Sequence, residues 1–381
     1  MSWRDWAETE NAAVRAAGQW RAPRAFDAAG PVGTLAGCDA PVVSFASNDY
    51  LGLTQHPAVI AAGHAALDRW GAGSGSARLI VGARPIHDEL EHALASWKQA
   101  ARAVLFPTGF AANLGVLTTF GTADTLVCSD ALNHASIIDG CRLSHATVAV
   151  YRHGDLEHLD QMLARRTQAR ALVVSDTVFS MDGDTADLDG LVRVAARHDA
   201  LLVLDEAHAV LGPALPAELA GGVEVVRVGT LSKTLGSLGG FVAASEPIAE
   251  LLVNRARPYI FTTATTPADA AAALAALRVL TGPEGAALVA HLRANVERVR
   301  PGHPSPIVPV MCGDEDRAVA AARALLERGF VVPAIRPPTV AAGTSRLRVA
   351  MSAAHTTEQV DGFVAALHDL GLLAPAAAHT G

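Results

Sequence analysis

Lysine is almost absent from this chain of 381 residues. Only Lys98 and Lys233 occur, and arginine supplies the rest of the 30 basic side chains. Arginine cannot replace lysine where the amine itself must react, because a guanidinium stays protonated and is a poor nucleophile. Lys233 also stands among glycines and hydroxyls, directly after an apolar run that is typical of a buried strand. An ordinary surface lysine is the alternative, but the scarcity favours a reactive amine, such as one that forms an imine with a carbonyl.

Basic runs and long apolar runs are missing as well. The net charge is −8 and no cluster of Lys or Arg forms a basic patch, so we expect no binding to nucleic acid or to an anionic membrane surface. No stretch reaches the roughly 20 charge-free apolar residues of a membrane span. The N-terminus lacks the apolar core of a signal peptide. These absences predict a soluble cytoplasmic protein.

Cysteines and aromatic residues are few. Cys38, Cys128, Cys141 and Cys312 show no C-x-x-C spacing, which predicts reduced, buried thiols in a reducing compartment rather than disulfides or a zinc site. Aromatic residues make up 5% of the chain, whereas 50% is hydrophobic. A large core therefore has to be packed from Ala, Val and Leu, and the length suggests roughly two or three domains.

Short apolar runs alternate with helical patterns between residues 85 and 245. The predicted strands are 103–106, 125–128, 147–151, 171–175, 201–204 and 223–228, and the helices between them are 85–100, 109–120, 133–143, 156–165 and 188–198. Strands this apolar, joined by helices, predict a parallel sheet covered on both faces. Right-handed crossovers then give a doubly wound α/β domain, in which ligands collect at the carboxyl ends of the strands.

The two ends of the chain follow other patterns. Residues 1–22 are predicted as one amphipathic helix, and Pro57 opens a helix that reaches Trp70. After two alanine-rich helices, residues 301–306 are the best linker candidate. A small α+β part follows, with strands at 307–310, 331–335 and 346–350, helices at 317–328 and 357–370, and a frayed tail at 375–378. The predicted division is 1–45 (an N-terminal helix and strand segment), 46–285 (a large α/β domain) and 286–381 (a small α+β domain).

Four familiar chemistries lack the sequence pattern that they require. Asp205–His208 spells D-E-A-H, as in a helicase, but neither lysine belongs to the P-loop that such an ATPase requires. The glycine loop at 71–76 fails the dinucleotide fingerprint because Ser76 stands where a third Gly or Ala belongs. No H-E-x-x-H metal motif and no G-x-S-x-G nucleophile elbow is present.

The position of Asp205 indicates which cofactor Lys233 would hold. Pyridoxal 5'-phosphate (PLP) withdraws electrons only while its ring nitrogen stays protonated, and a carboxylate beside that nitrogen keeps it so. Asp205 ends a predicted buried strand and is the candidate for this role, with Lys233 as the lysine that holds the cofactor as a Schiff base. His208 is placed to hydrogen-bond the phenolic oxygen of the cofactor or to orient Asp205, and a purely structural histidine is its alternative.

Other polar residues also follow predicted strands. Gly109 and Phe110 open a helix whose N–H groups suit a phosphate, although Thr108 before them is equally explained as a helix cap. Thr230 and Ser232 add hydroxyls for the same phosphate.

His134 and Ser180 stand on two further loops at strand ends. An imidazole at position 134 suits stacking on a planar ring. Taken singly, His134 and Ser180 are each better explained as structural residues, but their shared position at strand ends favours a common site.

At this point the chain resembles the α-oxoamine synthases, which are fold-type-I PLP enzymes. The matching segments are 47–53, 108–113, 133–136, 178–184, 205–208, 230–233 and 346–348, spread over residues 20–370. Within the family, 335–340, 343–348, the opening Met1-Ser2-Trp3 and Arg21 are most similar to the member that serves biotin biosynthesis. The resemblance implies a PLP-dependent acyltransferase, active as a cytoplasmic homodimer, that condenses L-alanine with pimeloyl-CoA or a pimeloyl-carrier protein and releases carbon dioxide.

The resemblance also implies roles for individual residues. Lys233 would hold the cofactor and then take the α-proton, Asp205 would face the ring nitrogen, and His134 would stack on the ring and meet the substrate. The remaining cofactor contacts would be Gly109, Phe110, Ser180, His208 and Thr230. Arg348 would hold the amino-acid carboxylate, while Arg21 and Thr339 would meet the acyl substrate.

Two departures from the family pattern concern the substrate side. Ala77 stands where the family usually has a serine, and the segment after His208 is short. The competing activities within the family are glycine C-acetyltransferase and, further off, the synthases of 5-aminolevulinate and sphingoid bases. A non-catalytic regulatory protein with the same fold is the alternative from another class.

Overall fold

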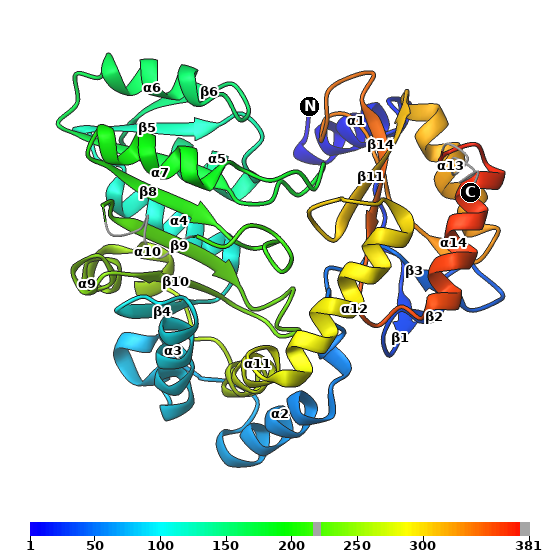
Figure 1. The fold of residues 1–381 in the computed structure, drawn as a ribbon, viewed down its shortest axis with the longest axis horizontal. Helices are drawn as coiled ribbons and strands as arrows, with labels where there is room; N and C mark the ends of the chain where they lie inside the picture. Colours follow the sequence, from blue (N-terminus) through cyan, green and yellow to red (C-terminus); the bar gives the residue numbers. More distant parts are fainter. Residues whose placement is uncertain (216–221, 374–381) are drawn as a thin grey trace, which may run out of the picture.

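The computed structural model describes residues 1–215 and 222–373 (Figure 1). A large α/β part and a smaller part, which contains both the N-terminal strands and the C-terminal segment, lie side by side. Helix α12 (Pro283–Val299) runs from one to the other. The tail at 375–378, predicted to fray, lies outside the described residues.

A seven-stranded sheet forms the centre of the large part, in the order β4-β10-β9-β8-β7-β5-β6. The strands are β4 (Arg102–Phe106), β5 (Thr125–Asp130), β6 (Thr147–Tyr151), β7 (Arg170–Asp176), β8 (Ala200–Asp205), β9 (Val225–Thr230) and β10 (Gly240–Ala244). β5 to β9 pair in parallel, and only β10 runs antiparallel to its neighbours β4 and β9. The predicted doubly wound, mostly parallel sheet is confirmed. β10 was not predicted, because a five-residue run of Gly, Phe, Val and two alanines carries a weak strand signal.

Helices cover both faces of this sheet because successive strand residues point to opposite sides. Val127 and Val174 pack with α4 and α5, whereas their chain neighbours Cys128 and Val173 pack with α6 and α7. The helices of the large part are α2 (Pro57–Trp70), α3 (Pro85–Trp97), α4 (Gly109–Phe120), α5 (Ala135–Leu143), α6 (Leu156–Ala164), α7 (Leu188–Arg197), α9 (Glu246–Arg255), α10 (Arg257–Ile260) and α11 (Pro267–Leu280). The predicted alternation of strands and helices between residues 85 and 245 is therefore confirmed, with ends that shift by at most three residues.

The smaller part contains two sheets. β11 (Ile307–Gly313), β14 (Ser345–Ala350) and β13 (Ala334–Ile335) form an antiparallel sheet packed by α13 (Glu315–Leu326) and α14 (Thr357–Asp369). β1 (Phe26–Ala28), β2 (Val32–Leu35), β3 (Val42–Ser44) and β12 (Phe330–Val331) form the other. The N-terminal segment and the C-terminal segment thus share one sheet, through the parallel pairing of β3 with β12.

The single strand predicted at 331–335 is wrong. It divides into β12 and β13, which belong to different sheets. Pro333 lies between them and has no N–H to donate to a ladder, so one continuous pairing is not available there. Its carbonyl still accepts a hydrogen bond from the amide of Arg348.

The N-terminal helix is shorter than predicted. α1 spans Trp3–Ala16 instead of 1–22, and Gly18 at φ 66° ends it in the left-handed region. No residue of α1 is buried. Arg336 donates to the carbonyl of Gly18 at 2.6 Å and ties this end to the smaller part. Arg21 lies beyond the helix, on exposed chain without regular secondary structure.

All four cysteines are free thiols. Cys128, Cys141 and Cys312 are buried as predicted, but Cys38 is only partly buried, because it follows the short outer hairpin β1–β2. Among the described residues no single helix is long and apolar enough to span a membrane. Only α11 and α12 together, bent by 79°, pass the length and hydropathy test.

Candidate functional site

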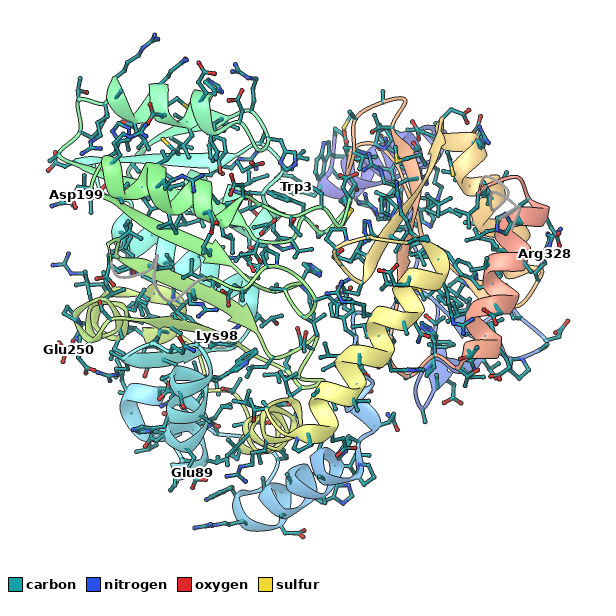
Figure 2. All side chains as sticks on the ribbon, viewed as in Figure 1. Trp3, Glu89, Lys98, Asp199, Glu250 and Arg328 are labelled. Atoms are coloured by element: carbon teal, nitrogen blue, oxygen red, sulfur yellow. The ribbon has the colours of Figure 1, made fainter. Side chains whose placement is uncertain are left out.

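The predicted site residues meet where the parallel strands end. Asp199 lies at the outer edge of the large part (Figure 2) and immediately precedes β8. β8 therefore runs from that edge toward the smaller part, and Asp205 at its carboxyl end faces the middle of the molecule (Figure 1). This is the edge at which doubly wound sheets bind ligands.

Asp205 is buried and held by two donors. The side-chain amide of Asn113 on α4 donates to Oδ2 at 2.6 Å, and the amide of Ala207 donates to Oδ1 at 2.9 Å. Asp176, its neighbour in the strand register, is buried as well. Burial and the charge of Asp205 raise the pKa of Asp176 well above its usual range. The carboxyl group of Asp176 therefore ionises less readily than that of an ordinary aspartate.

Lys233 stands at the head of a chain of hydrogen bonds. Its Nζ lies 3.0 Å from Nε2 of His208, and Nδ1 of His208 lies 2.6 Å from the Tyr50 hydroxyl. That hydroxyl donates to Oδ1 of Asn48 at 3.1 Å. With Lys233 as donor, His208 must carry its hydrogen on Nδ1 and donate it to Tyr50. These hydrogen bonds therefore all point the same way, from the amine of Lys233 to Asn48.

Burial sets the charge states along this chain. It lowers the pKa of Lys233, an effect that the charges of Asp205 and Asp176 partly offset and that of Arg348 reinforces. Burial and then the charge of Lys233 lower the pKa of His208 well below its usual range, so the imidazole is neutral. Burial also raises the pKa of Tyr50 to about 12. The amine is therefore the group of this chain that gains or loses a proton most readily.

Arg348 on β14 contacts Asn48, the last residue of the hydrogen-bond chain that starts at Lys233. Its Nη2 donates to Oδ1 of Asn48 at 3.2 Å, and its Nε donates to the carbonyl of Ser180. The contact with residue 180 uses the backbone and not the hydroxyl. The next arginine along the strand, Arg346, is paired with Asp182. A buried guanidinium at this position is suited to bidentate binding of a carboxylate.

His134 caps α5 and joins the network of Asp205. Its Nδ1 lies 2.7 Å from the hydroxyl of Ser136, which accepts a hydrogen bond from Asn113 at 2.9 Å. The ring of Phe110 meets the His134 ring edge-on, with centroids 6.5 Å apart. Burial lowers the pKa of His134, which favours the neutral ring. Asn113 thus holds the carboxylate of Asp205 and, through Ser136, the imidazole.

A cradle of small residues lies at the start of α4. The hydroxyl of Thr108 accepts from the amide of Ala111 at 3.0 Å, and the first-turn amides of Gly109 and Phe110 have no acceptor within the helix. A Cβ added to Gly109 would lie 3.2 Å from Cβ of Thr230. The Thr230 hydroxyl lies 2.8 Å from that of Ser232. Two free amides and two hydroxyls fit a phosphate.

Most predicted site residues are thereby connected, and together they fit PLP. The cradle suits its phosphate, Asp205 its ring nitrogen, His134 its ring face and Lys233 its aldehyde carbon. Arg21 and Thr339 are exposed, and no hydrogen bond or ion pair within the described ranges connects either to this network. Their roles, like the catalytic roles of the connected residues, stay predictions.

Five residues of the network were not assigned a role from sequence: Asn48, Tyr50, Asn113, Ser136 and Asp176. Each lies in or beside a segment that carries the family resemblance, which is the signal that could have found it. Tyr50 and His208 are 158 positions apart, and nothing in the local pattern of either residue indicates the other.

Comparison with known proteins identifies the family of this chain. Residues 40–367 match the family Aminotransferase class I and II. The chain is 50% identical, over 95% of its length and 94% of the relative's, to an 8-amino-7-oxononanoate synthase of Anaeromyxobacter dehalogenans. A serine palmitoyltransferase of S. paucimobilis, solved with bound PLP and myriocin, superposes with a TM-score of 0.88 at 32% identity, over 97% of this chain and 98% of that one. An 8-amino-7-oxononanoate synthase of Francisella tularensis gives 0.72 at 27% identity, over 86% and 97%.

Proposed function

Because this chain belongs to the aminotransferase class I and II family, and within it to the α-oxoamine synthases, we propose that it condenses L-alanine with a pimeloyl thioester. The products are 8-amino-7-oxononanoate, carbon dioxide and the free thiol, in biotin biosynthesis. The observation that carries this proposal is the 50% identity to an 8-amino-7-oxononanoate synthase over 95% of the chain.

PLP supplies an electron sink that stabilises negative charge on the α-carbon of the bound amino acid. The residues around the cofactor bind and orient it. Asp205, fixed by Asn113 at 2.6 Å, keeps the ring nitrogen protonated. The amides of Gly109 and Phe110 and the hydroxyl of Thr230 bind the phosphate. His134 covers one face of the ring.

Lys233 first holds the cofactor and then acts as the base that takes the α-proton. A base must have a pKa close to the working pH, and burial lowers that of Lys233 toward it. The neutral His208 accepts a hydrogen bond from the amine and keeps it directed. The proton therefore moves between substrate carbon and Nζ without a second ionisable base.

Arg348 binds the carboxylate of alanine. Its guanidinium is buried and oriented by Asn48 and by the carbonyl of Ser180. This contact would orient the bound amino acid relative to Lys233. We further propose that Arg21 and Thr339, both exposed, meet the pimeloyl group.

A homodimer in the cytoplasm is part of the same proposal. Leu79, Ile80 and Val81 are exposed to 49, 74 and 69%, and Phe261 is exposed to 70%. The carbonyl of Ser76, just before this stretch, accepts the amide of Ala264, just after Phe261. A cluster of apolar side chains of this kind favours contact with a second chain. The four free thiols suit a reducing compartment.

A substrate panel tests the function. Release of free thiol is measured with pimeloyl-CoA and L-alanine, acetyl-CoA and glycine, and palmitoyl-CoA and L-serine. The last pair is included because a serine palmitoyltransferase superposes at a TM-score of 0.88. The proposal expects the first pair to be fastest by kcat/KM, and a faster rate with either other pair contradicts it. Pimeloyl-carrier protein replaces pimeloyl-CoA in a parallel arm to identify the acyl donor.

A further inference from the structure

We propose that His153 is a positioning residue that joins two loops of the site and thereby sets the affinity for the amino-acid substrate. The inference rests on the proposed function only in naming L-alanine as that substrate. His153 follows β6, precedes α6 and has no assigned role in the chemistry.

His153 bridges two carboxylates from different strands. Its Nδ1 lies 2.9 Å from Oδ1 of Asp130, at the end of β5, and its Nε2 lies 2.8 Å from Oδ2 of Asp184, in the loop after β7. Carboxylates accept and do not donate, so both ring nitrogens carry hydrogen and the ring is an imidazolium. The Phe179 ring meets it edge-on at 4.4 Å between centroids. The cation therefore connects three neighbouring strand ends.

The bond from His153 to Asp130 connects the imidazolium to the loop that carries His134, on the cofactor side of the site. This buried carboxylate accepts the amides of Leu132 at 2.8 Å and Gly154 at 3.0 Å. The short segment from Asp130 to His134 is thus held at its start by the His153 bridge. Its other end is fixed by the bond from the His134 amide to Asp176 at 2.9 Å.

The bond from His153 to Asp184 connects the imidazolium to the loop that contacts Arg348, on the substrate side of the site. The carbonyl of Asp184 accepts the amide of Phe179 at 3.0 Å, and the carbonyl of Phe179 accepts that of Gly183 at 2.8 Å, which closes the loop tightly. Ser180 within this loop offers its carbonyl to Nε of Arg348. Movement of Asp184 is therefore passed to the guanidinium that binds the carboxylate of alanine.

Asp184 depends on His153 for its charge partner. One carboxylate oxygen meets the imidazolium, and the other is buried without a hydrogen-bond partner among the residues that the structure describes. Loss of the imidazolium removes this charge partner, and the buried Oδ1 gains a new partner only if the loop moves. The effect is expected on substrate binding, because no atom of His153 contacts the predicted reacting groups.

His153→Phe and Asp184→Asn test the inference in the PLP-loaded chain. The first keeps a ring against Phe179 but donates no hydrogen bond, and the second keeps the size but loses the charge. The dissociation constants of L-alanine, glycine and L-serine are measured by the change in cofactor absorbance, and KM for the acyl thioester is measured separately. Hydrogen exchange at the amides of Phe179 and Gly183 is followed in the same variants.

Each variant is expected to raise the dissociation constant of the preferred amino acid about three- to tenfold, the range that loss of one ordinary hydrogen bond gives, because the change reaches Arg348 only through the loop. KM for the thioester stays within about twofold, exchange at both amides speeds up, and the double variant is no worse than either single one.

His198→Phe is the matched control. His198 makes the same kind of contact with Asp160, at 2.9 Å, but lies at the amino end of β8, away from the site. It is expected to leave all three affinities unchanged. Unchanged amino-acid affinity in His153→Phe, with only the loss of melting temperature that His198→Phe shows, overturns the inference. Preference for glycine or serine overturns the choice of alanine instead, and the His153 variants are then judged on that amino acid.

Discussion

The amine of Lys233 lies 3.0 Å from Nε2 of His208. His208 is neutral, since burial and the charge of Lys233 lower its pKa well below the usual range. A neutral imidazole accepts the hydrogen bond of the amine and offers no competing positive charge. The hydrogen bond to His208 therefore keeps the amine oriented in both of the roles proposed for Lys233, holding the cofactor and moving a proton.

The two lysines of the chain give a matched pair of variants. Lys233→Ala is expected to abolish the absorbance at roughly 410–430 nm that PLP shows when bound through a lysine. Lys98→Ala is expected to keep that band, because Lys98 is engaged with Glu206 at 2.7 Å and lies over the Trp97 ring. Its cost falls on stability and is expected to stay below the roughly 3 kcal/mol of a broken buried ion pair in urea unfolding, because Arg227 still pairs with Glu206 at 2.7 Å. A band that survives in Lys233→Ala would refute the assignment.

Arg348 is predicted to tune the reactivity of Lys233. Its positive charge helps to lower the pKa of the amine. Arg348→Leu should therefore raise that pKa and move the pH profile of PLP attachment to the cofactor-free protein toward higher pH. Arg346→Leu is the control, because the charge of Arg346 is taken up by Asp182. If the two variants shift the profile equally, the charge of Arg348 does not act on Lys233.

Gly109 is predicted to be needed for phosphate binding. A Cβ at this position would meet Cβ of Thr230 at 3.2 Å, so the cradle has to widen. Gly109→Ala is expected to raise the dissociation constant of PLP about tenfold, as overpacking of this kind costs roughly 1–3 kcal/mol. Gly63→Ala, in the middle of α2, meets only a carbonyl at 3.9 Å and should bind PLP normally. Equal PLP affinity in the two variants would place the phosphate elsewhere.

The stability of the chain should depend on pH through His153. Burial alone would lower the pKa of His153, but hydrogen bonds and charges from Asp130 and Asp184 outweigh it and raise that pKa. Those two carboxylates are the charged groups that face the ring, since neighbouring Arg152 is paired with Asp155.

The stabilisation is therefore complete below the ordinary histidine range and is lost as the pH rises through the raised value. Against His153→Phe, the wild-type chain should gain about 0.5–1 kcal/mol at low pH, allowing for solvent screening of a ring that is 32% exposed. Urea unfolding near pH 6 and near pH 9 measures the difference, which should shrink at the higher pH. A difference that grows with pH would contradict the imidazolium bridge.

Sequence predicts the location of the site better than its connections. Parallel strands bring their carboxyl ends to one edge, so Asp205, His134 and Ser180 could be placed together once the strands were recognised. Lys233 was singled out because lysine is rare in this chain, and that signal does not depend on the fold. What could not be predicted are contacts that depend on how loops fold back, such as Tyr50 with His208 and His153 with Asp184.

The fold shows the same limit. The central parallel strands carry apolar runs and were found. β10, with a glycine and two alanines, carries a weak strand signal, and the strands of the outer hairpin β1–β2 are too short to show a period. The split at Pro333 depends on which sheet each half can reach, and the pairing of β3 with β12 joins segments nearly 290 positions apart. The predicted limits at 45 and 285 stay predictions.

Carbon balance with labelled alanine tests the central claim most directly. The PLP-loaded protein is incubated with pimeloyl-CoA and L-alanine that carries ¹³C in its carboxylate, and Lys233→Ala serves as the blank. The account predicts one labelled carbon dioxide for each CoA released, together with unlabelled 8-amino-7-oxononanoate. Release of CoA without labelled carbon dioxide, or a product that retains the label, would contradict it.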